Sequence, residues 1–123
     1  GGNYVEVDLT NQKLYLYKNS ELIMSSNIVS GSVSQTHMTP TGVYQVYSME
    51  KNTVLRGADY ASPVSFWMPF NGGIGFHDAT WQAYFGGDRY TYAGSHGCIN
   101  MPLDAAATLY SIIDTNVPIV CFY

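Results

Sequence analysis

The chain has 123 residues, of which 46% are apolar and 11% charged, and five basic against nine acidic residues give a net charge of −4. This length suits one domain with one core, so we expect a single domain over residues 1–123. The scattered basic residues form no stripe that could follow a phosphate backbone, and no apolar run is long enough to cross a bilayer, which argues against nucleic-acid binding and against membrane contact by this domain.

Alternating polar and apolar residues predict short strands along most of the chain. The first three, at 4–9, 13–19 and 21–30, are separated by two short turns, which is typical of an antiparallel meander. Eleven tyrosines favour the same class, because aromatic side chains fit a pleated, half-buried surface. We expect a mainly β, sandwich-like fold with one helix beside it, and further strands at 42–49, 64–70, 74–77 and 117–123.

One helix is expected from about Pro102 to Ile113. Apolar residues recur there at helical spacing, and proline suits a first helical turn because its missing N–H costs nothing at that place. Asn100 is suited either to capping this helix or to a functional site. Residues 31–41 and 78–95 fit neither a helix nor a strand pattern, and glycines and aromatics in the second segment indicate an ordered surface loop that could carry function.

Two histidines accompany a cysteine in glycine-rich surroundings. His96 and Cys98 stand in GSHGCINMP, and His77 stands upstream in GIGFHDA. Cys98 is a candidate nucleophile, metal ligand or core residue. A nucleophile needs a lowered thiol pKa, which the N-terminus of the expected helix and a nearby histidine could provide. A zinc site of these three residues lacks an obvious fourth ligand. The other cysteine, Cys121, is expected to be a small buried residue of the last strand.

Gly97 adds a second element to this stretch. A glycine lets the backbone turn sharply and lets a substrate approach closely. The N–H groups of Gly97 and Cys98 could then point at one spot and form an oxyanion hole for an acyl-transfer intermediate. One short segment would supply both the nucleophile and the donors.

These motifs resemble a known family. HDATW, followed after seventeen intervening residues from its histidine by SHGCIN, is similar to the signature of L,D-transpeptidase catalytic domains of the YkuD type. TPTGVY at 39–44 and SPVSFWMPF at 62–70 resemble further segments of the family. The resemblance implies enzymes that cut a peptidoglycan stem after its third residue and release the terminal D-Ala. The stem is held as a thioester and passed to the amine of a second stem, which makes a 3→3 cross-link.

The resemblance also implies roles for individual residues. Cys98 would be the nucleophile and His77 the general base and later acid. Asp78 would steady His77, either through its backbone carbonyl or, as in other triads, through its carboxylate. The oxyanion region would be lined by His96, Gly97 and Cys98. Its geometry would be held by Ser95 and Asn100.

Aromatic residues around these motifs are candidates for the substrate cleft. Trp81, Tyr84, Phe85 and Tyr60 could wall the cleft, with Asn100 as a further substrate-binding residue, whereas Trp67 and Met68 are expected in the core. One of Asp59, Asp78 and Asp88 is expected to recognise the side-chain amine of the stem's diamino acid.

The partners and location follow from the same resemblance. Peptidoglycan stem peptides would be the substrate, no cofactor or metal is implied, and nothing demands more than a monomer. The enzyme would act outside the cytoplasm, in the cell wall or at the outer face of the bacterial membrane, and carbapenems would acylate Cys98. The abrupt Gly1-Gly2 opening favours a domain excised from a longer wall-associated protein. The alternatives are an L,D-carboxypeptidase, a cysteine peptidase, a sortase-like transpeptidase, which the lack of Arg or Lys after Cys98 disfavours, and a catalytically silent wall-binding module.

Overall fold

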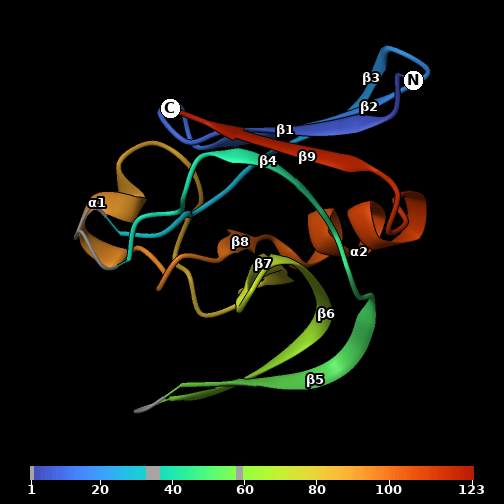
Figure 1. Ribbon diagram of the computed structural model, residues 1–123. Helices are drawn as coiled ribbons and strands as arrows, with labels where there is room; N and C mark the ends of the chain where they lie inside the picture. The colour runs from blue at the N-terminus through green and yellow to red at the C-terminus, as the bar shows by residue number, and fades with distance from the viewer. Residues whose placement is uncertain (1, 33–36, 58–59) are drawn as a thin grey trace.

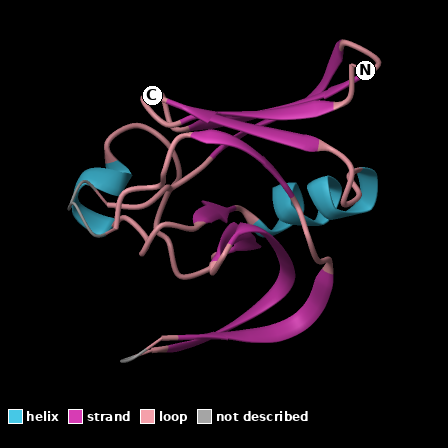
Figure 2. Ribbon diagram, in the orientation of Figure 1, coloured by secondary structure: helices cyan, strands magenta, loops and turns pink. Residues whose placement is uncertain are grey.

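Two sheets face each other across one core in the computed structural model, which describes residues 2–32, 37–57 and 60–123 (Figure 1). The first sheet has five strands, in spatial order β3 (Glu21–Asn27), β2 (Lys13–Lys18), β1 (Tyr4–Asp8), β9 (Pro118–Phe122) and β4 (Gly42–Gln45). The second has four, β5 (Glu50–Arg56), β6 (Ala61–Asn71), β7 (Ile74–Asp78) and β8 (Ile99–Met101). The helices are α1 (Arg89–Ala93) and α2 (Leu103–Ile112) (Figure 2).

The predicted meander is present, and its alternating pattern builds half of the core. β1, β2 and β3 pair in antiparallel order. Val5 and Val7 are fully buried while Glu6 between them is only half-buried, as expected for side chains that alternate across a strand. β9 pairs with β1 in parallel, which brings the C-terminal strand into the middle of the sheet. Cys121 on β9 is 3% exposed and belongs to the core, so its prediction as a small buried residue is confirmed.

Helix α2 joins the two sheets at one end of the core. It contacts β6 and β7, and its buried residues Ala106 and Leu109 belong to the same apolar cluster as residues from both sheets. The helix is capped at Pro102 with no side-chain cap, so the prediction that Asn100 caps it is wrong. Asn100 lies instead in β8, where its main chain pairs with Val29.

Three elements were not predicted. β5 exposes most of its length and is largely polar, so it lacks the apolar alternation that marks a strand. β8 has only three residues, all buried, and α1 has five residues, none buried. Segments this short carry no periodic signal in the sequence. The described residues thus contain α1 as a second helix beside the expected one.

The register of the second sheet determines which residues face the site. Trp67 on β6 pairs with His77 on β7, and His77 pairs with Asn100 on β8. Residues that pair directly across neighbouring strands share a face, so these three side chains form a row on one face. Phe76 and Ile99, the residues next to them, are fully buried in the core on the other face.

Candidate active site

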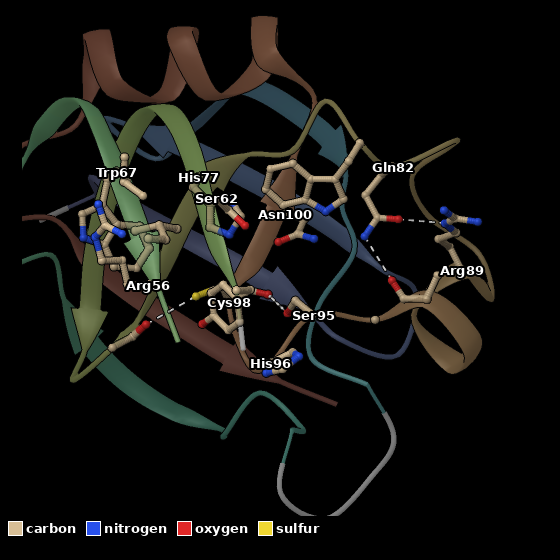
Figure 3. A pocket seen from close by; sticks show the side chains of 17 residues that line it. Arg56, Ser62, Trp67, His77, Gln82, Arg89, Ser95, His96, Cys98 and Asn100 are labelled. Carbon is tan, nitrogen blue, oxygen red and sulfur yellow. Dashed lines mark hydrogen bonds between the residues drawn. The ribbon is translucent and has the colours of Figure 1, made fainter. Parts of the chain in front are cut away.

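An open cavity of about 570 Å³ lies over this row (Figure 3). Trp67, expected in the core, lines the cavity, whereas Met68 is fully buried in the core as predicted. Gly97, Asp78 and Tyr84 are not among the lining residues. The predicted site residues that do line it are Cys98, His77, His96, Ser95, Asn100, Trp81 and Tyr60.

His77 is held by its own backbone neighbour. Its Nδ1 lies 2.8 Å from the carbonyl oxygen of Asp78. A carbonyl only accepts, so Nδ1 carries the proton and Nε2 keeps a free lone pair. The ring lies between Trp67, with centroids 6.0 Å apart, and Trp81, at 5.7 Å. Burial lowers the pKa of His77 below 6.5, although the backbone hydrogen bond with Asp78 opposes this shift. A neutral imidazole near pH 7 is suited to accept a proton.

The Asp78 carboxylate has a different task. It is 5% exposed and accepts hydrogen bonds from the backbone N–H groups of Ser65, at 3.0 Å, and Phe66, at 2.8 Å. These bonds tie β6 to the end of β7 and occupy the carboxylate. The structure therefore favours the backbone alternative for steadying His77, and it leaves this aspartate unavailable for a substrate amine.

Cys98 is half-buried directly before β8. Its thiol donates to the carbonyl of Gly73 at 3.4 Å. Burial raises the pKa of the Cys98 thiol above 9.0, while a backbone hydrogen bond with Gly75 acts in the opposite direction. The expected lowering by a helix N-terminus is wrong, because β8 separates the cysteine from α2. The resting pair is therefore a neutral thiol and a neutral imidazole.

The turn before Cys98 is clamped from both sides. Ser95 Oγ donates to the carbonyl of Cys98 at 2.5 Å and accepts from the N–H of Gly97 at 3.2 Å. Gly97 has φ +126°, a conformation that side chains rarely adopt, and an added Cβ would lie 3.1 Å from Ile74. The Gly97 N–H is thus engaged by Ser95. The Cys98 N–H has no acceptor among the hydrogen bonds of the described residues and is free to face an oxyanion.

Thr39 is a site residue to which the sequence assigned no role. It is fully buried, and its Oγ1 donates to the carbonyl of Gly97 at 2.6 Å while accepting from the N–H of Gly31 at 2.9 Å. The hydroxyl therefore connects the segment that begins TPTGVY to the cysteine turn. The TPTGVY motif was the one signal in the sequence that pointed to Thr39. Its contact with Gly97 joins residues 58 positions apart, so no local sequence pattern could predict it.

His96 belongs to an aromatic stack at the cavity. It is exposed, its ring stacks on His37 with centroids 4.2 Å apart, and Tyr60 lies edge-on at 5.2 Å. His96 and Tyr60 therefore contribute aromatic surface to one side of the cleft, next to the cysteine turn.

Asn100 lines the cavity and carries a buried acceptor that is unused among the described residues. The residue is 2% exposed, and its main chain exchanges two hydrogen bonds with Val29, at 2.8 and 2.9 Å. Its Oδ1 is buried with no hydrogen-bond partner in the described part of the chain. Trp81 is 52% exposed at the cavity, whereas Tyr84 bonds with Asp88 and Tyr92 outside the lining.

Over residues 2–32, 37–57 and 60–123, no three His, Cys, Asp or Glu side chains are placed to hold a metal ion, so the structure does not gather His77, His96 and Cys98 into a zinc site. Within the same residues, none of the helices has the length and apolar character that a membrane span requires.

The fold and the site define a class: mainly β domains with a cysteine and a buried histidine in one open cavity. The model of the L,D-transpeptidase catalytic domain (YkuD) matches residues 2–121. The chain belongs to this family, which confirms the resemblance drawn from its motifs. No curated protein sequence matches the chain.

Solved structures agree with this assignment. A crystal structure of a cysteine-to-serine mutant of the Enterococcus faecium L,D-transpeptidase is 38% identical, with a TM-score of 0.94 over 99% of this chain and 50% of that one. The NMR structure of the E. faecium catalytic domain is 39% identical, with a TM-score of 0.87 over 98% of this chain and 96% of that one. An L,D-transpeptidase from Mycobacterium tuberculosis shares the fold at 17% identity, with a TM-score of 0.86 over 99% of this chain and 58% of that one. The chain thus spans about half of the crystallised E. faecium protein.

Proposed function

We propose that the domain is a peptidoglycan L,D-transpeptidase that works through a thioester on Cys98. The observation that carries the proposal is the tautomer of His77. Its Nδ1 is engaged by the Asp78 carbonyl, so a free Nε2 lone pair is left in the cavity that also holds the thiol. A neutral base beside a protonated thiol is suited to acyl transfer.

The acylation step begins with a proton transfer. Because burial raises the pKa of Cys98, the thiol loses its proton to His77 Nε2 as the sulfur attacks the carbonyl after the third stem residue. The Cys98 N–H faces the oxygen that becomes negative. The carbon–nitrogen bond then breaks, His77 returns the proton to the departing amine of D-Ala, and the thioester remains.

The second step reverses these roles. The amine of an acceptor stem attacks the thioester carbonyl and gives a proton to His77, which returns it to the departing sulfur. The product is a 3→3 cross-link and a free Cys98 thiol. Water in place of the amine would give a shortened stem, which is the hydrolytic alternative.

Other residues support this chemistry without exchanging protons. Asn100 Oδ1, buried and unpartnered in the described residues, is placed to accept an N–H of the donor stem. Ser95 and Thr39 hold the Gly97–Cys98 turn. Trp81, Tyr60 and His96 provide the aromatic wall.

The biological setting belongs to the same proposal. We place the domain outside the cytoplasm, acting as a monomer on stem peptides of the cell wall, within a larger wall-associated protein. The E. faecium catalytic domain has been solved acylated by ertapenem, at 38% identity to this chain. We therefore expect carbapenems to acylate Cys98.

The test is intact-mass spectrometry of the protein mixed with tetrapeptide stems. A mass gain equal to the stem without its terminal D-Ala is expected for the wild type and absent in Cys98→Ala. Cys121→Ala is the matched control, because it removes the other thiol and should still acylate. An acceptor amine should discharge the adduct into a cross-linked product. Discharge to the free acid alone would indicate a carboxypeptidase, and a folded protein that never acylates would indicate a binding module.

A further inference from the structure

The described residues that line the cavity carry a charge opposite to that of the protein. They include two of the five lysines and arginines, Arg56 and Arg89, and no aspartate or glutamate of residues 2–32, 37–57 and 60–123 is among them. The expected contact between an aspartate and a substrate amine therefore has no support here. The Asp78 carboxylate is occupied by backbone, Asp88 accepts from Tyr84, and Asp59 lies outside the described residues. A cavity with this charge favours an anionic ligand.

Arg89 is held in place before any ligand arrives. Its Nε donates to Gln82 Oε1 at 2.8 Å, and Gln82 Nε2 in turn donates to the carbonyl of Ala93 at 3.0 Å. The guanidinium carbon lies over the rings of Tyr84, at 5.2 Å from the centroid, and Tyr92, at 5.5 Å. A side chain fixed in this way loses less conformational entropy when it binds.

The binding end of Arg89 remains free. Only Nε is engaged, and the terminal NH₂ groups have no acceptor in the described part of the chain. The neighbouring carboxylate of Asp88 accepts a hydrogen bond from Tyr84, and Arg89 has no hydrogen bond with it among the described residues. Two parallel N–H donors at the end of a guanidinium match the two oxygens of a carboxylate. Figure 3 shows the Arg89–Gln82 pair at one end of the cavity, with Cys98 towards its middle.

We propose that Arg89 binds a carboxylate of the donor stem and so sets the position of the carbonyl that Cys98 attacks. This inference rests on the proposed function. Three stem carboxylates have the required chemistry: that of the terminal D-Ala, the α-carboxylate of a γ-linked second residue, and a side-chain carboxylate on the third residue. Arg89 is a specificity residue here and takes no part in proton transfer.

The test measures acylation rates with stems in which one carboxylate at a time is converted to an amide. For one of the three, the wild type should lose roughly 10- to 100-fold in rate, the range expected when a charge-assisted hydrogen bond is lost. Arg89→Gln should lose a similar factor with the unmodified stem and show no further loss with that amide. The amide that behaves in this way identifies the carboxylate. Arg89→Lys should recover part of the rate, because the charge returns without the paired donors.

Two controls separate this effect from damage to the protein. Lys51→Gln removes a cation that lies over the Tyr110 ring at 5.3 Å but does not line the cavity, and it should leave all rates unchanged. Alkylation of Cys98 by iodoacetamide, a neutral reagent, should be the same in Arg89→Gln and wild type. If Arg89→Gln responds to all three amides as the wild type does, the inference is wrong while the proposed function stands. If none of the stems acylates the wild type, both the inference and the proposed function are wrong.

Discussion

The two central side chains, His77 and Cys98, rest in their uncharged forms, and burial is the main cause for both. It lowers the pKa of His77 and raises the pKa of Cys98. In the proposed mechanism, the thiolate therefore forms at the moment of attack, with His77 taking the proton. A cysteine held as a stable thiolate–imidazolium pair would instead be reactive at all times.

The alkylation rate of Cys98 tests this resting state. In a Cys121→Ala background, the rate with iodoacetamide should rise about tenfold per pH unit between pH 6 and 8, because the thiolate fraction of an acid well below its pKa rises in that way. At pH 8 the rate should be lower than that of an unstructured cysteine peptide, which serves as the control. A rate that is flat from pH 6 to 8 would reveal an ion pair and contradict the neutral resting state.

Helix α2 supports the strands that carry the site. It contacts β6 and β7, which hold Trp67 and His77. Leu109 is its largest fully buried side chain, while Leu103 on the same helix is 44% exposed. The helix thus positions the site through packing, although none of its residues lines the cavity.

Two leucines of α2 give a matched pair for this packing. Leu109→Ala should lower the free energy of unfolding by about 2–5 kcal/mol, because it removes buried methyl groups and leaves a cavity. Leu103→Ala makes the same chemical change at an exposed position and should alter it by no more than ~0.5 kcal/mol. Urea unfolding of both variants measures the difference. Equal effects would show that α2 is not packed as described.

Folding of the whole molecule buries His77, a titratable group of the cavity, and this burial links stability to pH. His77 has a lower pKa when folded than the ordinary value of 6.5, so below about pH 6.5 the unfolded chain binds a proton that the folded chain does not. Acid therefore favours unfolding. At the other extreme, burial raises the pKa of Cys98 and takes that of Cys121 to about 12, so alkaline pH also favours the unfolded chain.

The free energy of unfolding should accordingly fall as the pH drops from 7 to 5. Urea unfolding at several pH values measures the slope. His77→Gln should flatten it, whatever its effect on stability at pH 7, because the variant has no imidazole to protonate at that position. His96→Gln removes an exposed histidine and should keep the wild-type slope. An unchanged slope in His77→Gln would contradict the link.

Local patterns were sufficient for the meander, for α2 and for the family. The alternation around Val5 and Val7 predicted the meander, and the helical spacing around Leu109 predicted α2, because side-chain periodicity reports burial directly. The histidine and cysteine motifs identified the family from residue type and spacing. β5 was not predicted because it is largely polar and exposed. β8 and α1 were not predicted because segments of three and five residues are stabilised by their neighbours and not by a pattern of their own.

The environment of the site depended on contacts between distant parts of the chain. Asp78 could have oriented His77 through either of its oxygen-bearing groups, and only the position of β6 shows that its carboxylate is occupied. The thiol pKa was expected to fall and instead rises, because burial is a property of the packed molecule. Sequence thus specified the chemical groups and their local conformations. Folding set their charges, their hydrogen-bond partners and the arginines that line the same cavity, because all three depend on which residues come close together in space.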